Sequence, residues 1–364
     1  MPDLSSDTGA GRVDLDDPEA LRAADATGAL LHASMAGAQL RAVATAVDGG
    51  ALDGLTGFRP RAVVWVSGRS DRARQAAGVV AALAGAAGGP AVPPLVHART
   101  LPAWVGALDV VLVSGDDAGD PDLAAAIDAA AGRGAAVIVD VPREGPVSEA
   151  GRGRASWIEP LPYLPPHRGV LRHLAAGMAV LTALGARGLD VCAAADAVDV
   201  ELEGIGPELA TPVNPAKLLA TSVSGRDPLV WIHADAVSAA CCERAVAAFC
   251  DAGRITAASS VGDAVRAGAE RAQGRPPVDP LADLFHDEEL DGPLEVVRVR
   301  YLGMVLNADE DIVRLAAGPL ADVEWVTDRG RDTVGDAPAP LSGKVAAHMA
   351  RTELSAAYLL VGGL

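Results

Sequence analysis

The stretch Asp109–Asp140, DVVLVSGDDAGDPDLAAAIDAAAGRGAAVIVD, predicts a complete βαβ unit. Its first run, Val110–Val113, is apolar and rich in β-branched residues, which suits a strand buried on both faces of a parallel sheet. Asp120 is a suitable N-cap for the helix that follows, and Pro121 occupies the first helical position, where no N–H is needed. Glycines then end the helix before a second apolar strand at Ala136–Val139.

Residues 62–86 repeat this pattern of strand, Ser/Gly turn and helix. A strand is expected at Ala62–Val66, a turn at Ser67–Asp71 and an Ala-rich helix at Arg72–Ala86. In a doubly wound sheet, the loop after such a strand lies at the carboxyl edge, where ligands bind and helix N-termini attract phosphate. The turn at Ser67–Asp71 and the turn at Ser114–Gly119 can therefore face each other across a crevice.

The 364 residues have room for about two domains. Residues 1–20 are polar and are expected to form a disordered or loose arm, and residues 21–190 a first domain that begins with helical spacing over 21–47. The Gly/Pro-rich join GIGPELATP lies within 191–212, which we interpret as a linker. Residues 213–364 form the predicted second domain. The elements expected in it are a strand at 229–232, a helix at 235–251, strands at 294–301 and 323–326, and a helix at 342–360.

The resulting fold class is α/β, with two tandem domains, each a mainly parallel sheet between layers of helices. Half of the residues are hydrophobic but only 3% are aromatic, so the cores must consist mainly of Ala, Val and Leu. A formal charge of -18 argues against a nucleic-acid partner, because phosphate backbones bind basic surfaces. The four cysteines show no CxxC spacing and are expected to be reduced. No signal peptide or membrane span is recognisable, so a cytoplasmic protein is expected.

With both halves laid out, the chain resembles the bacterial and archaeal bifunctional phosphoglucose/phosphomannose isomerase family, which has two sugar isomerase (SIS) domains. The most specific similarity is NPAKLLA, residues 214–220, which resembles the segment that opens the family's second domain. The resemblance implies two SIS-type domains, a role in carbohydrate metabolism and a possible homodimer. It also implies an aldose–ketose isomerase that interconverts glucose 6-phosphate or mannose 6-phosphate with fructose 6-phosphate.

The resemblance further implies where a hexose 6-phosphate would bind. The positions that correspond to the family's phosphate-binding loops are Ser67, Gly68, Ser70, Ser114 and Gly115.

Three more residues are candidates by the same resemblance. PPHR, residues 165–168, is similar to a Gln-Pro-Arg segment and implies that Arg168 contacts the substrate. LFHDE, residues 284–288, is similar to a Leu-Asn-His-Asn-Glu segment and implies that His286 opens the sugar ring. An alignment on Arg244 brings Asp251 to the position of the catalytic base. By residue type alone, Arg168 also fits a solvated or ion-paired arginine and His286 a solvated loop histidine.

The chain departs from the family at several positions. Asp116 and Asp117 place carboxylates where the family has hydroxyl and amide donors, and each opposes a phosphate by roughly 1 kcal/mol at an effective dielectric near 20. Asp251 is one methylene shorter than the family's glutamate. The sequence stops at Leu364, without the segment that bears a site lysine, so we expect a divergent, C-terminally truncated member. Two functions stay open: an active isomerase, and a degenerate protein that binds a sugar phosphate or a partner protein without turnover.

Neither a cofactor nor a metal ion is expected. The two Ser/Gly turns contain neither GxGxxG nor a P-loop, which disfavours a nucleotide-dependent enzyme. The acidic residues next to His286 lie too close together in the sequence to form a convincing metal cage. The expected partner is a small sugar phosphate, with no nucleic acid and no membrane.

Overall fold

The computed structural model describes residues 12–87, 93–160, 169–225, 227–274, 298–320, 322–326, 333–334 and 337–364. Contacts divide the chain into two compact units. Unit 1 comprises Met1–Ser224 together with Arg329–Leu364, and unit 2 comprises Gly225–Asp328. Unit 1 therefore takes its last helix from the far end of the sequence.

The main sheet of unit 1 is entirely parallel, with the strand order β2-β1-β3-β4-β5. Its strands are β1 (Ala62–Val66), β2 (Leu95–Ala98), β3 (Asp109–Ser114), β4 (Ala136–Asp140) and β5 (Ser156–Trp157). The chain moves outward from β1 to β2 and then returns to the other side of β1 for β3. This reversal between β1 and β3 is the place where doubly wound sheets bind ligands.

The structure confirms the βαβ unit predicted from Asp109–Asp140. Every residue of β3 is buried, as expected for a strand inside a parallel sheet. Asp120 caps α5 (Pro121–Gly132) by accepting a hydrogen bond from the backbone N of Asp122 at 2.9 Å. After the helix, Gly134 has a φ of +78°, a left-handed conformation that favours glycine.

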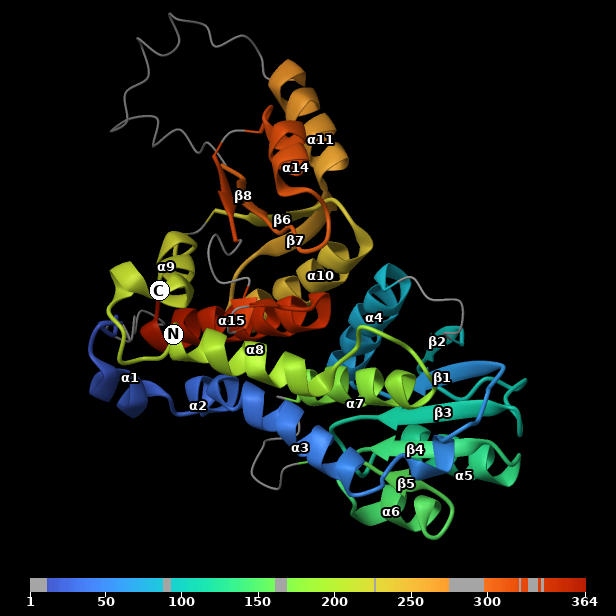
Figure 1. The fold of residues 1–364 in the computed structure, drawn as a ribbon. Coiled ribbons are helices and arrows are strands. Elements are labelled where there is room, and N and C mark those ends of the chain that lie inside the picture. The colour runs from blue at the N-terminus through green and yellow to red at the C-terminus, as the bar shows by residue number, and fades with distance from the viewer. Residues whose placement is uncertain are drawn as a thin grey trace, which may run out of the picture. The chain divides into compact units, whose positions relative to one another are not determined.

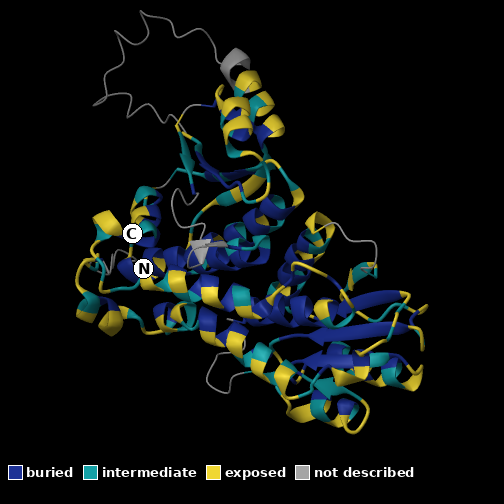
Figure 2. Cartoon of the chain, in the orientation of Figure 1, coloured by how far each residue is buried: buried dark blue, intermediate teal, exposed yellow. Residues whose placement is uncertain are grey.

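Helices cover both faces of this sheet (Figure 1). On one face α5 and α6 (Gly145–Gly151) pack against alternate residues of the strands, in a core formed by Val, Ala, Leu and Ile side chains. On the other face lie α4 (Asp71–Ala86) and α7 (Val170–Ala183). A Cβ at Gly177 of α7 would lie 2.1 Å from the ring of Trp65, so glycine allows this close approach. The central strands β1 and β3 are accordingly buried throughout (Figure 2), whereas the outer strands β2 and β5 are less buried.

The helical pattern at residues 21–47 forms three helices instead of one: α1 (Pro18–Ala24), α2 (Ala29–Ser34) and α3 (Ala36–Asp48). The break before α2 falls at Gly28, whose φ is +66°. The arm predicted at residues 1–20 is attached over the part that the structure describes, because Val13 N donates to Gly362 O at 3.0 Å. Residues 1–11 lie outside the described residues.

The linker predicted at 191–212 begins instead with a packed helix, α8 (Val191–Glu203). It lies along α3 and the long C-terminal helix α15 (Leu341–Gly362), as Figure 1 shows. Within this interface Arg351 donates from Nε and a terminal nitrogen to both carboxylate oxygens of Glu201, at 2.7 and 2.8 Å.

The contact-based division of the chain differs from the predicted boundary at residue 213. Both α9 (Pro215–Ser222) and α15 belong to unit 1. The physical reason is that α15 is buried on nearly every side and so requires neighbours all round, which α8, α9 and α2 supply. Unit 1 also contains the short antiparallel pair β10 (Thr333–Val334) and β11 (Ala337–Pro338), and the 3-10 helices η1 (Asp53–Leu55) and η3 (Thr211–Val213).

Unit 2 has a smaller parallel sheet of order β7-β6-β8-β9. Its strands are β6 (Leu229–His233), β7 (Thr256–Ser260), β8 (Arg300–Gly303) and β9 (Val323–Trp325). Helix α10 (Ala236–Asp251) packs on one face through Phe249 against Trp231, while α11 (Val261–Gly274) and α14 (Glu310–Ala317) pack on the other.

Two strands of unit 2 differ from the sequence predictions. β7 has the sequence TAASS, which contains no apolar run, and it was not predicted. The strand expected at 294–301 begins at Arg300 in the described part, and residues 294–297 lie outside the described residues. No helix in the described parts of either unit is long and apolar enough to cross a membrane.

We predict that Arg351→Ala lowers the free energy of unfolding by about 3–5 kcal/mol, because it removes the guanidinium that donates two hydrogen bonds to the buried Glu201 carboxylate. Urea denaturation followed by circular dichroism measures the change. Arg154→Ala is the matched control, since Arg154 pairs with Asp128 on the surface and such pairs contribute under about 1 kcal/mol. Equal effects of the two variants would contradict the prediction.

Candidate functional site

The candidate site is the carboxyl edge of the unit 1 sheet, where two loops meet at the reversal of strand order. The loop Ser67–Ser70 follows β1, and the loop Gly115–Asp120 follows β3. The structure brings all five predicted phosphate-binding residues to this edge: Ser67, Gly68, Ser70, Ser114 and Gly115.

The backbone donors of the first loop are already used. Each N–H from Ser67 to Ser70 donates to an oxygen of the protein at 2.9–3.1 Å, the acceptors being Ala98 O, Arg99 O, Asp120 Oδ2 and Ser67 O in that order. Phosphate-binding loops rely on free N–H groups that point at the ligand. These four N–H groups are therefore not free to receive a phosphate in this conformation.

The side chain of Asp116 occupies the centre of the site. Ser70 Oγ donates to Asp116 Oδ2 at 2.6 Å, and His173 Nε2 lies 3.2 Å from Asp116 Oδ1. Arg172 approaches the same carboxylate at 3.7 Å. A hydroxyl, an imidazole and a guanidinium thus converge on one anion, and that anion belongs to the protein.

A second carboxylate, Asp140 at the end of β4, completes the cluster. Its Oδ2 lies 2.6 Å from His173 Nδ1, and its Oδ1 lies 3.1 Å from Arg172 Nε. Arg172 also donates to Gly115 O at 3.1 Å. The side chains of Asp140 and His173 are completely buried. We call Asp116, Asp140, Arg172 and His173 the charged quartet.

The charges of the quartet shift the pKa values of Asp116 and His173 in opposite directions. Burial alone would raise the pKa of Asp116, but the charge and hydrogen bond of His173, with help from Ser70 and Arg172, lower it to about 2. Burial alone would lower the pKa of His173, but the carboxylates of Asp140 and Asp116 outweigh it and the pKa is raised. Two cations therefore balance two anions, as buried charges require.

The remaining residues of the two loops are also held within the protein. Ser67 Oγ lies 2.9 Å from His97 Nε2. Ser114 is buried, and its hydroxyl finds no hydrogen-bond partner in the described part of the chain. Gly68 has a φ of +52°, and a Cβ there would lie 2.4 Å from Asp120 Oδ2, so this tight turn requires glycine.

Of the three predicted catalytic residues, the structure describes only Asp251. Arg168 and His286 lie outside the described residues. Asp251 is exposed at the end of α10 in unit 2, five residues before β7 begins at Thr256. It therefore lies at the amino edge of that unit's sheet, and the structure gives no support to Asp251 as a base for a ligand at the opposite, carboxyl edge.

The sequence analysis missed Asp140, Arg172 and His173. Arg172 and His173 are adjacent charged residues in α7, a helix that is otherwise apolar and fully buried at its centre. A buried charge needs a partner, so this pair in an apolar helix was a usable signal. Nothing in the sequence, however, indicated which carboxylates would meet it.

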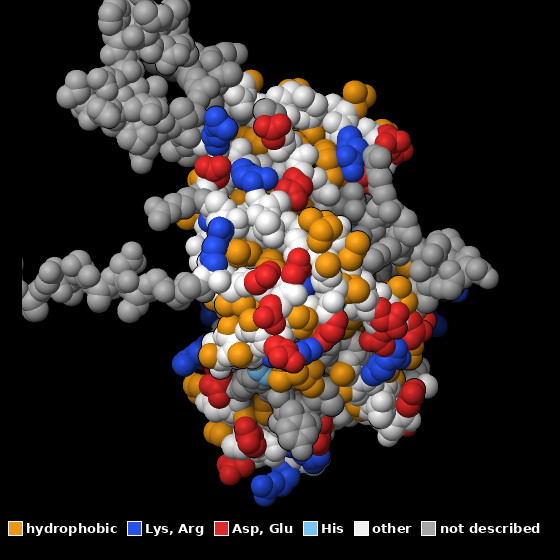
Figure 3. All heavy atoms as spheres, turned by 90° about the vertical axis from the view of Figure 1, so that its left-hand side faces the viewer, with side chains coloured by type: hydrophobic (Ala, Val, Ile, Leu, Met, Phe, Trp, Pro, Cys, Tyr) orange, Lys and Arg blue, Asp and Glu red, His pale blue; other side chains and the backbone are white. Residues whose placement is uncertain are grey.

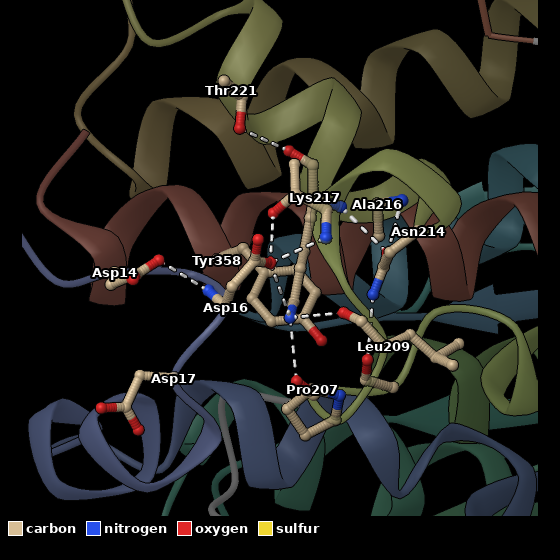
Figure 4. Close-up of polar contacts among 12 residues, drawn as sticks. Asp14, Asp16, Asp17, Pro207, Leu209, Asn214, Ala216, Lys217, Thr221 and Tyr358 are labelled. Carbon is tan, nitrogen blue, oxygen red and sulfur yellow. Dashed lines mark hydrogen bonds and ion pairs between the residues drawn. The ribbon is translucent and has the colours of Figure 1, made fainter.

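The NPAKLLA segment, which carries the most specific resemblance, has a structural role (Figure 4). Asn214 caps α9 by accepting hydrogen bonds from the N–H groups of Ala216 and Lys217 at 3.0 Å. The buried Lys217 ammonium donates to Pro207 O at 2.8 Å and Leu209 O at 2.7 Å. Lys217 therefore fixes the preceding turn against α9.

The described residues offer no metal centre, since no three His, Cys, Asp or Glu side chains are placed to hold an ion in those parts of the chain. On the face drawn in Figure 3, acidic, basic and hydrophobic side chains lie interspersed.

No protein-family model matches the sequence, and a comparison with curated proteins finds no match either. Solved structures do match. Tagatose-6-phosphate ketose/aldose isomerase from Escherichia coli has a TM-score of 0.54 at 11% identity, over 92% of this chain and 91% of that chain. A protein assigned the same activity, from Clostridium novyi NT, has a TM-score of 0.54 at 10% identity, over 96% and 93%. A protein assigned as sugar binding, from Salmonella typhimurium LT2, has a TM-score of 0.53 at 10% identity, over 91% and 99%.

At these identities the likeness establishes the fold. The chain has the α/β fold of phosphosugar isomerases, with parallel sheets flanked by helices, which confirms the predicted fold class. The narrower resemblance to the bifunctional phosphoglucose/phosphomannose isomerases stays a prediction.

We predict that the quartet makes stability depend on pH. The folded-state pKa of Asp116 is about 2, below its ordinary 3.8, so Asp116 stabilises the fold above about pH 4 by about 2 kcal/mol, and this is lost as the pH falls toward 2. The pKa of His173 is raised above 6.5, so its contribution is full below 6.5 and is lost as the pH rises through the raised value.

Thermal unfolding midpoints between pH 2 and pH 9 measure this dependence. In Asp116→Asn the decline below pH 4 should become shallower. If the unfolding midpoint of the variant declined below pH 4 as steeply as that of the wild-type protein, the ionic role of Asp116 would be contradicted.

We also predict that Lys217→Met lowers the free energy of unfolding by about 2–3 kcal/mol, because the two partly buried carbonyls of Pro207 and Leu209 lose a charged donor. Binding of hexose phosphates should not change, since Lys217 lies in the NPAKLLA turn and makes no contact with the quartet. Urea denaturation and calorimetric titration of the same variant measure the two effects. Loss of binding with unchanged stability would give the segment a ligand role instead.

Proposed function

We propose that this protein binds a sugar phosphate, of the hexose 6-phosphate class, without isomerising it. The fold supports the ligand class, because proteins named as sugar-phosphate isomerases and as a sugar-binding protein share it. The observation that carries the proposal is the position of Asp116. The edge of the sheet still surrounds an anion with Ser70, Arg172 and His173, but the anion is a carboxylate of the chain itself.

The same observation argues against turnover. Aldose–ketose isomerisation moves a proton between neighbouring carbons and needs a base whose pKa lies near the working pH. Asp116 has a pKa of about 2 and is held in an ion cluster, so it is a weak base at neutral pH. His173 is buried, its two ring nitrogens lie next to Asp140 and Asp116, and these carboxylates raise its pKa, so neither nitrogen is free to act on a substrate.

The predicted contacts fit a binding role equally well. Arg168 is proposed to contact the ligand, since it directly precedes α7, the helix that carries Arg172 and His173. His286 is proposed as a ligand contact on the strength of the sequence resemblance. The alternative function is an active isomerase for glucose, mannose and fructose 6-phosphates, in which His286 opens the ring.

Two measurements on the purified full chain decide between these functions. The protein is incubated with fructose 6-phosphate, and the appearance of glucose 6-phosphate and mannose 6-phosphate is followed with coupling enzymes. The thermal unfolding midpoint is then measured with each of the three hexose 6-phosphates, and with free fructose as the control that lacks the phosphate.

We expect no turnover and an increased midpoint with at least one hexose 6-phosphate but not with fructose, because a ligand that binds only the folded state stabilises it. Turnover would establish the isomerase instead. No shift with any of the three sugar phosphates would contradict both functions.

A further inference from the structure

The side of β1 that faces β2 differs in charge from the side that faces β3. On the β3 side, Asp116 and Asp140 fill the space between the strand ends. On the β2 side, the exposed side chains of His97 and Arg99 lie beside the Ser67–Ser70 loop. The guanidinium of Arg99 thus brings a positive charge to this edge in a protein whose formal charge is -18, while burial and the nearby arginines lower the pKa of His97 and favour its neutral form.

Arg99 is held in place by the loop. Its Nε donates to Gly68 O at 3.2 Å, while the backbone N of Gly68 donates to Arg99 O at 3.1 Å. The bond through Nε leaves the two terminal nitrogens of the guanidinium for another acceptor. No carboxylate pairs with Arg99 among the residues that the structure describes. A positioned guanidinium of this kind suits a phosphoryl oxygen pair.

His97 stands next to Arg99 with one ring nitrogen fixed. Its Nε2 lies 2.9 Å from the buried Ser67 Oγ, which leaves Nδ1 for a ligand. Arg74, in the first turn of α4, adds positive charge near this imidazole, although its own guanidinium pairs with Asp71 at 3.3 Å. The N-terminus of α4 contributes a favourable partial charge at the same edge.

We propose that Arg99 and His97, supported by Arg74, bind the phosphoryl group of the ligand on the β2 side of β1. This inference rests on the proposed function and names the part of the edge that recognises the phosphate. It follows from the distribution of charge at this edge. The β3 side already holds the carboxylates of Asp116 and Asp140. The β2 side presents the guanidinium of Arg99, which no carboxylate pairs with among the described residues.

The test is calorimetric titration at low ionic strength, in a chloride buffer, of the full chain with inorganic phosphate and with fructose 6-phosphate. The variants are Arg99→Gln, Arg99→Lys and His97→Asn. Arg133→Gln is the matched control, because Arg133 is also an exposed arginine of unit 1 that donates to backbone carbonyls, those of Pro102 and Ala103.

Arg99→Gln should weaken both probes about tenfold, which corresponds to the loss of one charge-assisted hydrogen bond. His97→Asn should weaken them less, Arg99→Lys should retain part of the affinity, and Arg133→Gln should match the wild-type protein. A thermal unfolding midpoint for each variant shows that it is folded.

Wild-type affinity in both Arg99→Gln and His97→Asn would overturn the proposed site, and so would the absence of inorganic phosphate binding in the wild-type protein. The site and the proposed function can also be told apart. If phosphate binding depends on Arg99 but fructose 6-phosphate binds no more tightly than phosphate, the result would support this site and overturn the proposed sugar-phosphate function.

Discussion

The ionic contact of Asp116 with Arg172 and His173 is the constraint on which the ligand edge of unit 1 depends. A buried charge is tolerated only when an opposite charge lies close to it, so four charged side chains below the surface must be paired with one another. The quartet is paired in this way, and its ion pairs join the β3 loop, the end of β4 and α7. Ser70 adds the β1 loop to the same cluster. A ligand on the β3 side of this edge therefore meets charges that the protein already pairs with one another.

The arrangement of the quartet shows that the fold of unit 1 does not by itself determine the chemistry at its ligand edge. The chain shares the fold of phosphosugar isomerases, and its strand order reverses between β1 and β3, the place where doubly wound sheets bind ligands. The donors that such a site offers are nevertheless used internally: backbone N–H groups by carbonyls and Asp120, and the Ser70 hydroxyl by Asp116. Binding without turnover follows more naturally from this than catalysis does, because function depends on the side chains of the site and not on the fold.

The NPAKLLA segment shows how a sequence similarity can be structural. Asn214 and Lys217 are completely buried, and their polar atoms are bonded to the helix cap and to carbonyls of the preceding turn. The segment opens α9 as the resemblance implied, but α9 lies in unit 1, together with α15 from the end of the chain. Unit 1 is discontinuous because the buried helix α15 needs neighbours on all sides, and a linear scan for linkers cannot detect that requirement.

Local sequence by itself determined the three strands β1, β3 and β4 and the helices α4 and α5 of unit 1. The apolar run of β3, the Asp120 cap and the terminating glycines of α5 were all readable, because each acts within a few residues. It also showed that Asp116 places a carboxylate where a phosphate-binding loop needs a hydrogen-bond donor. Only the tertiary structure decided what Asp116 contacts, since Arg172 and His173 lie 56 and 57 residues further along the chain and reach it through the packing of α7 on the sheet. Charge pairing across such separations depends on which helix face meets which strand end, and that is fixed by packing and not by local pattern.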